Sequence, residues 1–313
     1  MSRIIVTHMR PDLDAVGAVW AIKRFLAGWE EAKIQFVPAG ERLQRLVSKR
    51  LASSYEKKQL NAKRYTLDAI EKIDDDEVIH VDTGLGPLDH HQTSDDNTCA
   101  AKRAWEFVVI NAKSPIKNHP HGLEAGKRLM DIICEIDHFK EVTWPDAASD
   151  RYEITAPRIL DGLKLMERDD DTKIMDFGLT LMDSLFHAFK NKVWAQEELK
   201  KGIVFETRFG QGIGIETLND DVVHLSQRLG YKIVVRKDPR KAYVRIKASP
   251  LGIVNKESID LTAVFNKLKE MDPAATWFLH VSKRMLLNGT TKNPKMRPTK
   301  LSLEEIIEVL KQI

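Results

Sequence analysis

A short stretch near the start of the chain gathers an imidazole and two carboxylates at the predicted junction of a strand and a helix. His8, Asp12 and Asp14 stand within seven residues of one another. Such groups at one strand end would repel each other unless a cation lay between them. Nitrogen and carboxylate ligands favour a borderline or hard ion such as Mn²⁺ or Mg²⁺. The alternative is a polar loop whose aspartates cap the following helix, since aspartate is a favoured N-cap.

Three further stretches carry residues of the same kinds. Asp82 follows a β-rich run, residues 89–91 read Asp-His-His within a predicted loop, and Asp137 closes a helical stretch. Taken singly, each has a plain structural alternative, such as a turn residue after a strand or a surface helix end. Asp131 and His138 compete with Asp137 for the last position.

The elements that must position these residues alternate along the first half of the chain. The pattern predicts strands over 3–7, 33–37 and 77–81 and helices over 15–25, 99–110 and 122–136. This order predicts an α/β fold, with a parallel sheet and helices on both faces. Ligands of such sheets bind beyond the carboxyl ends of the strands, where His8 and Asp82 both lie. A helical pattern over 41–72 is strongly basic and is typical of a solvated helix face.

The character of the chain changes after a long amphipathic helix predicted over 176–201. Ser302 with Glu305 three residues on predicts a capping box at the start of a final helix, over 303–310. We expect two domains, residues 1–190 with the candidate metal ligands and a smaller α+β domain over 202–313. The strand-like runs of the second domain cover 203–205, 212–215, 231–235 and 242–247.

Composition excludes several classes of protein. The 313 residues carry 49 Lys+Arg and 46 Asp+Glu, a net charge of +3, and 42% are hydrophobic, which excludes predominant disorder. No apolar run approaches the ~20 residues that span a bilayer, so we expect no membrane partner. Cys99 and Cys134 are too few for a disulfide framework and indicate a reducing compartment. Because the chain opens on a strand-like run without a signal-peptide pattern, we expect a cytoplasmic protein.

Together, the order and spacing of the motifs resemble the DHH phosphoesterase superfamily, which is named for the triplet found here at 89–91. The resemblance covers about residues 3–140. It implies a site for two Mn²⁺ ions, with Mg²⁺ or Co²⁺ as alternatives, that hydrolyses phosphoester or phosphoanhydride bonds. Asp82 would bridge the ions, and His91 would contact the substrate phosphate. The metal ligands that the resemblance implies are His8, Asp12, Asp14, Asp82, His90 and Asp137.

The second domain bears on the substrate. It lacks the Gly-Gly-Gly-His motif of some relatives and loosely resembles the Myg-type branch, which is associated with 3′–5′ exonuclease activity on RNA, whereas the first motif is closer to RecJ-type exonucleases and family II pyrophosphatases. Residues 283–300 are basic and contain no acidic residue, which suits a nucleic-acid backbone, with a solvated loop as the alternative. The candidate substrate contacts are His91, His280, Ser282, Lys283, Arg284, Asn288 and Gly289.

Three hypotheses about function follow. We expect a Mn²⁺-dependent phosphodiesterase, an exonuclease that acts on single-stranded or short RNA or DNA, with a nucleic acid or nucleotide as its partner. The alternative is a hydrolase of small phosphates, either an inorganic pyrophosphatase or a phosphodiesterase for cyclic or short dinucleotides. The third is a non-catalytic protein that binds nucleic acid or nucleotides. A homodimer is compatible with all three.

Overall fold

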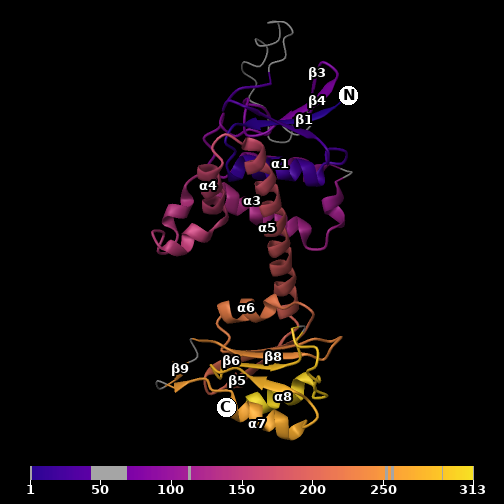
Figure 1. Ribbon diagram of the computed structural model, residues 1–313, viewed down its shortest axis with the longest axis vertical. Helices are drawn as coiled ribbons and strands as arrows, with labels where there is room; N and C mark the ends of the chain where they lie inside the picture. Colours follow the sequence, from indigo (N-terminus) through magenta and orange to yellow (C-terminus); the bar gives the residue numbers. More distant parts are fainter. Residues whose placement is uncertain are drawn as a thin grey trace. The chain divides into compact units, whose positions relative to one another are not determined.

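The computed structural model describes residues 2–43, 69–111, 114–250, 253–254, 257–290 and 292–312. Most of the basic helix predicted over 41–72 lies outside these residues. The fold is mixed α/β, and the chain divides into two compact units, Met1–Lys190 (unit 1) and Asn191–Ile313 (unit 2) (Figure 1). Within the described ranges, none of the helices combines the length and the apolar character needed to span a bilayer.

Unit 1 contains a mixed four-stranded sheet. Strand β1 (Arg3–His8) lies between and parallel to β2 (Lys33–Val37) and β4 (Asp76–His80). The prediction of a fully parallel sheet is wrong at one edge, where β3 (Glu71–Ile73) pairs antiparallel with β4. The chain reverses there in a two-residue turn at Asp74, which adopts a left-handed conformation with φ 55° that aspartate tolerates better than most residues.

The helices of unit 1 surround a central helix, α1. Its 13 residues are buried on almost every side, and Trp20 packs against the rings of Phe25, Trp105 and Phe186. A Cβ on Gly17 would lie only 2.9 Å from Ala101 Cβ, so the glycine lets α1 and α2 approach closely. The helices are α1 (Leu13–Phe25), α2 (Ala100–Ile110), α3 (Gly122–Asp137), α4 (Ala156–Met166) and α5 (Asp171–Leu199), whose last residues belong to unit 2, with 3₁₀ turns η2 (Pro115–Asn118), η3 (Lys140–Thr143) and η4 (Asp150–Ile154).

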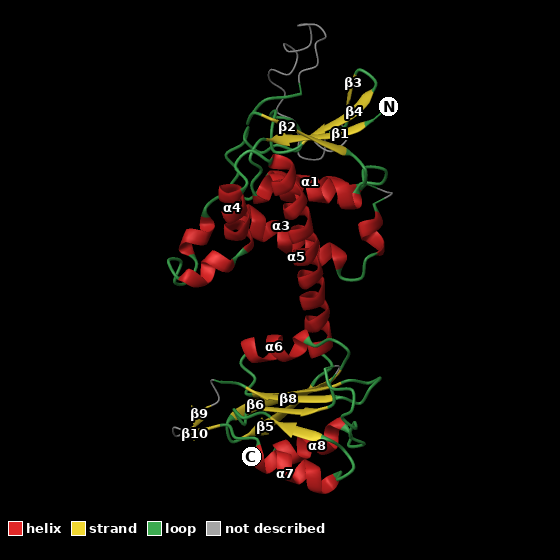
Figure 2. Ribbon diagram, viewed as in Figure 1, coloured by secondary structure: helices red, strands yellow, loops and turns green. Residues whose placement is uncertain are grey.

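The two faces of this sheet are covered differently. Figure 2 shows helices α1, α3 and α4 on one side of it. On another face of the sheet, Ile4, Val6 and Val78 pack against Leu43 and Ile73. The labelled helices of unit 1 therefore cover one face of this sheet, whereas the sequence predicts helices on both faces.

Unit 2 is built on a mixed six-stranded sheet with the order β11-β12-β8-β7-β6-β5, in which β6 and β7 are parallel and the other neighbours antiparallel. Strands β9 and β10 form a separate pair. The strands are β5 (Ile203–Thr207), β6 (Gly210–Glu216), β7 (Ile233–Lys237), β8 (Val244–Ala248), β9 (Ile253–Val254), β10 (Glu257–Ser258), β11 (Trp277–Leu279) and β12 (Met285–Asn288), and the helices are α6 (Asp221–Arg228), α7 (Thr262–Met271) and α8 (Leu303–Leu310).

Both faces of this second sheet are buried. Ile213 and Val234 pack against Ala195 and Leu199, residues near the end of α5. This packing places residues 191–201 in unit 2, whereas the sequence prediction began the second domain at residue 202. A second apolar cluster joins the sheet to α7 and α8, and the predicted capping box between Ser302 and Glu305 is present.

Candidate metal centre

The site forms where two neighbouring parallel strands end. β1 ends at His8, and Asp82 stands two residues beyond the end of β4. Because β1 and β4 are parallel, their carboxyl ends lie at the same edge of the sheet. Asp82 adopts a left-handed conformation, with φ 52°, and its backbone N–H donates to the carbonyl of Leu88. The backbone thus turns the carboxylate of Asp82 away from the strand, toward the residues that follow β1.

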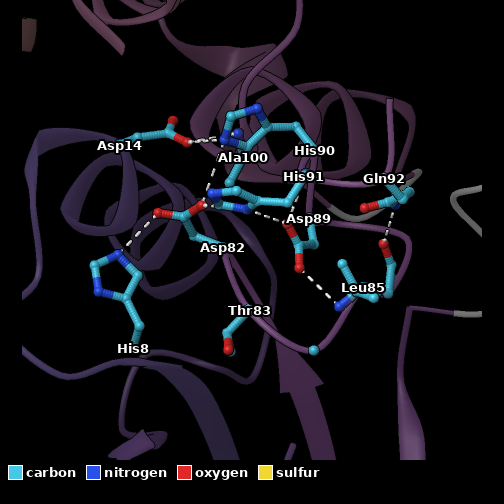
Figure 3. Close-up of polar contacts among 12 residues, drawn as sticks. His8, Asp14, Asp82, Thr83, Leu85, Asp89, His90, His91, Gln92 and Ala100 are labelled. Atoms are coloured by element: carbon cyan, nitrogen blue, oxygen red, sulfur yellow. Dashed lines mark hydrogen bonds and ion pairs between the residues drawn. The ribbon is translucent and has the colours of Figure 1, made fainter. Parts of the chain in front are cut away.

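The buried carboxylate of Asp82 faces imidazoles from two different segments (Figure 3). Its Oδ2 lies 3.1 Å from Nε2 of His8, and its Oδ1 lies 3.6 Å from Nε2 of His90. The Nδ1 of His91 lies 3.7 Å from the same Oδ1. One carboxylate therefore offers an oxygen to each of two ligand groups, which is the arrangement that a bridging ligand requires.

His90 and Asp137 complete the second group. Asp137 is the last residue of α3, and its Oδ2 lies 3.5 Å from Nε2 of His90. Within the described residues, Asp82 Oδ1, His90 Nε2 and Asp137 Oδ2 are buried and have no hydrogen-bond partner. Buried polar atoms are almost always paired, so three unpaired ones around a single point need an explanation.

Asp12 and Asp14 each combine a capping role with a place at the site. Asp12 caps α1 by accepting a hydrogen bond from the N–H of Ala15, while its other oxygen lies 3.9 Å from His8 Nε2. Asp14 caps a different helix, since its two oxygens accept from the N–H groups of Ala100 and Ala101 at the start of α2. Its Oδ2 also lies 3.6 Å from Nε2 of His90. The capping alternative and the ligand prediction are therefore compatible in both residues, because a carboxylate oxygen has more than one lone pair.

Neighbouring groups fix the histidine rings. His8 Nδ1 lies 2.8 Å from the carbonyl of Met9, and His91 Nδ1 lies 2.7 Å from Oδ1 of Asp89. Each contact holds the proton on Nδ1 and leaves Nε2 for the site or the substrate. The fully buried Asp89 does not face the centre, because it also accepts from the backbone N–H groups of His91 and Leu85. The first residue of the triplet thus positions the third.

Burial, reinforced by neighbouring carboxylates, dominates the electrostatics. Burial and then the neighbouring carboxylates raise the pKa of Asp14 well above its usual range. Burial followed by the charge of Asp12 raises the pKa of Asp82 despite the hydrogen bond with His8. Burial and the charges of Asp12 and Asp82 raise the pKa of Asp137 to about 6. A cation placed among these groups would remove this cost of ionisation.

The histidines respond to the same charges in opposite ways. Burial lowers the pKa of His8, but the hydrogen bond to Asp82 and the charges of Asp12 and Asp82 outweigh it and raise the pKa to about 9. Burial lowers the pKa of His90, which keeps the imidazole neutral and able to bind a metal. Burial also lowers the pKa of His91, but the hydrogen bond to Asp89 and the charge of Asp82 raise it overall.

These residues fit a divalent metal ion. Three groups place one ligand atom per residue within 4.8 Å of one another, and they are His8, Asp12 and Asp82; Asp82, His90 and His91; and His90, Asp137 and His138. Two ligands of the same ion, each about 2.1 Å from it, lie about 3 to 3.5 Å apart. The separations around His90 Nε2 are close to this value before any ligand moves. The donor set of imidazole nitrogens and carboxylate oxygens suits Mn²⁺, Mg²⁺ or Zn²⁺.

The structure separates the candidates at the end of α3. Asp137 points to the centre, whereas Asp131 forms ion pairs with Lys102 and Lys127. The sequence offers His138 only as an alternative to Asp137, yet it lies beside the centre, with Nε2 3.8 Å from Asp137 Oδ2 and 2.9 Å from the carbonyl of Thr98. Its position directly after Asp137 was the signal in the sequence.

The candidate contacts of unit 2 lie on and beside one hairpin. His280, Ser282, Lys283 and Arg284 form the turn between β11 and β12, where His280 Nδ1 lies 2.8 Å from Ser282 Oγ and Lys283 pairs with Asp260. Arg284 donates its backbone N–H to Ser282 Oγ. These polar side chains are available at the surface of the turn.

Asn288 and Gly289 serve the fold. Asn288 is fully buried, donates to the carbonyls of Thr276 and Arg297, and accepts from the N–H of Thr299. A substrate therefore cannot reach its amide, and the prediction that Asn288 contacts substrate is corrected. Gly289 has φ 82°, and a Cβ there would lie 2.0 Å from the ring of Tyr243, so glycine is required for the turn and its packing.

No family model matches the chain, and none of the curated proteins matches it. The chain is similar to the crystal structure of an uncharacterized protein from Helicobacter pylori G27, at 16% identity over 99% of this chain and 98% of that one, with a TM-score of 0.24. A score this low supports no conclusion about fold or function.

Proposed function

We propose that the chain is a divalent-metal-dependent phosphoesterase with a two-ion site of the DHH type, using Mn²⁺ and hydrolysing phosphodiester bonds of single-stranded or short nucleic acid as an exonuclease. The observation that carries the proposal is the convergence of three buried, unpaired atoms, Asp82 Oδ1, His90 Nε2 and Asp137 Oδ2. The parallel packing of β1 with β2 and β4, with His8 and Asp82 at the carboxyl ends of β1 and β4, supports the DHH-type assignment.

The residues divide into two ligand groups that share Asp82. His8 and Asp12 would hold one ion with Asp82 Oδ2, and His90, Asp137 and Asp14 would hold the other with Asp82 Oδ1. When bound, such ions supply a water of lowered pKa and neutralise charge on the phosphoryl oxygens.

His91 is the group that would contact substrate. Its ring is 58% exposed, and Asp89 holds its Nδ1 so that Nε2 is directed outward. A protonated imidazole there would donate a hydrogen bond to a phosphoryl oxygen whose charge increases during hydrolysis. The raised pKa of His91 favours that protonated form.

The substrate class rests on unit 2 and stays a proposal. The basic turn residues Lys283 and Arg284 begin a stretch without acidic residues through residue 300, which suits a nucleic-acid backbone. A small-phosphate hydrolase would need the metal centre but not this stretch. The proposed partner is thus a nucleic acid or nucleotide, and we propose a cytoplasmic enzyme.

A panel assay tests the proposal. Release of mononucleotides from labelled single-stranded RNA and DNA, and of phosphate from pyrophosphate, is measured with Mn²⁺, Mg²⁺, Co²⁺ and EDTA. We expect Mn²⁺-dependent cleavage that falls at least about 100-fold in Asp82→Ala and His90→Ala. Asp131→Asn is the matched control, because Asp131 lies on α3 but is paired with lysines away from the centre. Equal activity in wild type and Asp82→Ala would reject the site.

A further inference from the structure

A large cavity in unit 1 opens directly beside the metal centre. Its volume is about 910 Å³, which lies within the ~300–1,000 Å³ typical of small-molecule sites. One wall is made by residues of the centre, including Asp14, His90 and Asp137. The other wall is made by the segment 139–161, which follows α3 and runs through η3 and η4 into α4. No chemistry assigned to the metal centre uses this second wall.

Aromatic rings line the second wall. Phe139 is 74% exposed, and it adopts a left-handed conformation with φ 55°, which is an outlier for a bulky residue. The rings of Trp144 and Tyr152 lie 5.8 Å apart. Exposed aromatic rings beside a polar site offer flat surfaces on which another ring can stack. Phe139 directly follows Asp137 and His138 in the sequence, so this lining ring belongs to the part of the second wall that adjoins the metal centre.

The polar groups of this second wall suit a ligand that donates hydrogen bonds better than they suit an anionic ligand. Glu141 lines the cavity, and its Oε2 is buried without a hydrogen-bond partner within the described residues. Arg158 is the one lysine or arginine among the described lining residues, and it is paired with Glu153 and Asp161. A second phosphate group would therefore meet carboxylates and no unpaired cation. An N–H edge of a ring would instead meet the carboxylate of Glu141, which only accepts hydrogen bonds when ionised.

We propose that this cavity binds the nucleobase of a nucleotide whose phosphate lies at the metal centre. Stacking on Phe139 and Trp144 would hold the flat faces of the base, and Glu141 would accept a hydrogen bond from its N–H edge. The inference rests on the proposed function, and it deepens that function by favouring base-bearing phosphoesters over pyrophosphate. Phe139, Trp144 and Glu141 become specificity-determining residues that lie outside every motif of the sequence.

Calorimetric titration of the full chain tests the assignment. The probes are adenosine and guanosine 5′-monophosphates, ribose 5-phosphate and pyrophosphate, with Mn²⁺ present, and the free nucleosides in EDTA. We expect the nucleotides to bind about 5- to 100-fold more tightly than ribose 5-phosphate, as stacking of one base contributes. Phe139→Ala and Trp144→Ala should each weaken nucleotide binding about tenfold and leave ribose 5-phosphate binding unchanged.

Two further variants keep the test sharp. Ile154→Ala is the matched control, because Ile154 is an 80% exposed apolar residue of the same segment that does not line the cavity. Trp144→Phe keeps a ring and should restore most of the affinity that Trp144→Ala loses. Nucleotide-induced quenching of tryptophan fluorescence should shrink in Trp144→Phe, which a purely structural role for Trp144 would not produce.

The outcomes separate this inference from the proposed function. If nucleotides and ribose 5-phosphate bind equally, or if Phe139→Ala weakens both equally, the base site is wrong even where Mn²⁺-dependent hydrolysis is present. If nucleosides bind in EDTA with the expected sensitivity to Phe139→Ala while no Mn²⁺ binds, the base site stands and the metal-dependent function is wrong.

Discussion

Asp82 Oδ1 and His90 Nε2 lie 3.6 Å apart, and neither atom has a hydrogen-bond partner within the described residues although both are buried. This separation is too long for a direct hydrogen bond, but it suits two ligands of the same metal ion. Evolution of a stable fold alone would not leave these two atoms unpaired, because an unsatisfied buried group costs about 1–3 kcal/mol.

Metal binding should depend on these atoms and not on nearby acidic residues in general. We expect Mn²⁺ to raise the thermal midpoint of the wild-type protein, by an amount equivalent to about 2.7 kcal/mol at a hundredfold excess over Kd. Asp82→Asn, which removes a ligand of both ions, should abolish the shift in differential scanning fluorimetry, and His90→Ala, which removes a ligand of one ion, should reduce it. Asp131→Asn should retain it, and an equal shift in all variants would place the ion elsewhere.

The stability of the metal-free protein should fall between pH 4 and pH 6. The folded-state pKa of Asp137, about 6, lies above its ordinary value of 3.8, so the folded state holds this proton more tightly than the unfolded chain. The stabilisation is therefore complete below pH 4 and is lost as the pH rises through 6. Urea unfolding in EDTA should show that Asp137→Asn becomes more stable than wild type above pH 6, with no advantage at pH 4.

Manganese should reverse that comparison. Metal binding needs the ionised carboxylate, so affinity for Mn²⁺ should rise with pH through about 6 in the wild type. In the presence of Mn²⁺ at pH 7, Asp137→Asn should then be less stable than wild type. An Asp137→Asn protein that binds Mn²⁺ as the wild type does would remove Asp137 from the ligand set.

Asp89 should act through His91. Asp89→Asn leaves the metal ligands in place but loses the charged partner of His91 Nδ1, so we expect about 10- to 100-fold lower activity with unchanged Mn²⁺ affinity. Loss of that carboxylate should also lower the pKa of His91, measured by NMR titration of the ring, and shift the alkaline side of the pH–rate profile to lower pH, because the protonated ring is the form that donates to the phosphate. His91→Ala should cost about 10²- to 10³-fold. Reduced Mn²⁺ binding in Asp89→Asn would contradict this division of roles.

Two glycines on helices should respond oppositely to alanine. On Gly126 in α3, a Cβ would lie 2.0 Å from the ring of Trp105, so Gly126→Ala should destabilise unit 1 by about 1–3 kcal/mol. On Gly162 in α4, a Cβ would meet nothing within 4 Å, so Gly162→Ala should stabilise by about 0.5–1 kcal/mol. Urea unfolding measures both, and a stabilising Gly126→Ala would show that Trp105 moves freely.

The sequence predicts an element well when the contacts that form it lie between residues that are close together in the chain. Ser302 and Glu305 predicted the start of α8 because a capping box involves only neighbouring backbone groups. The short strand β3 was missed because Glu71–Ile73 ends a basic stretch with helical spacing, and pairing with β4 decides its conformation. Parallel strand ends brought His8 and Asp82 together as expected from topology alone.

The parts of the site that the sequence does not predict depend on contacts between residues far apart in the chain. The N–H groups that Asp14 caps belong to Ala100 and Ala101, which are far away in the sequence. Asn288 and His280 are equally polar, yet only packing shows that the amide of Asn288 is enclosed. Phe139, Glu141 and Trp144 of the cavity wall belong to no sequence motif. Their position beside the centre depends on where α3 ends in the folded chain, which the sequence does not predict.

The double duty of Asp14 bears on how related chains would diverge. Its carboxylate secures the first turn of α2 whether or not any chemistry takes place, whereas His90 and Asp137 contribute unpaired atoms that serve no neighbour. Under the proposed function, a lineage without hydrolysis would therefore retain Asp14 and lose the other two residues. On the same proposal, we expect a paralogue that retains all three residues to hydrolyse phosphoesters and one that retains Asp14 alone to be inactive.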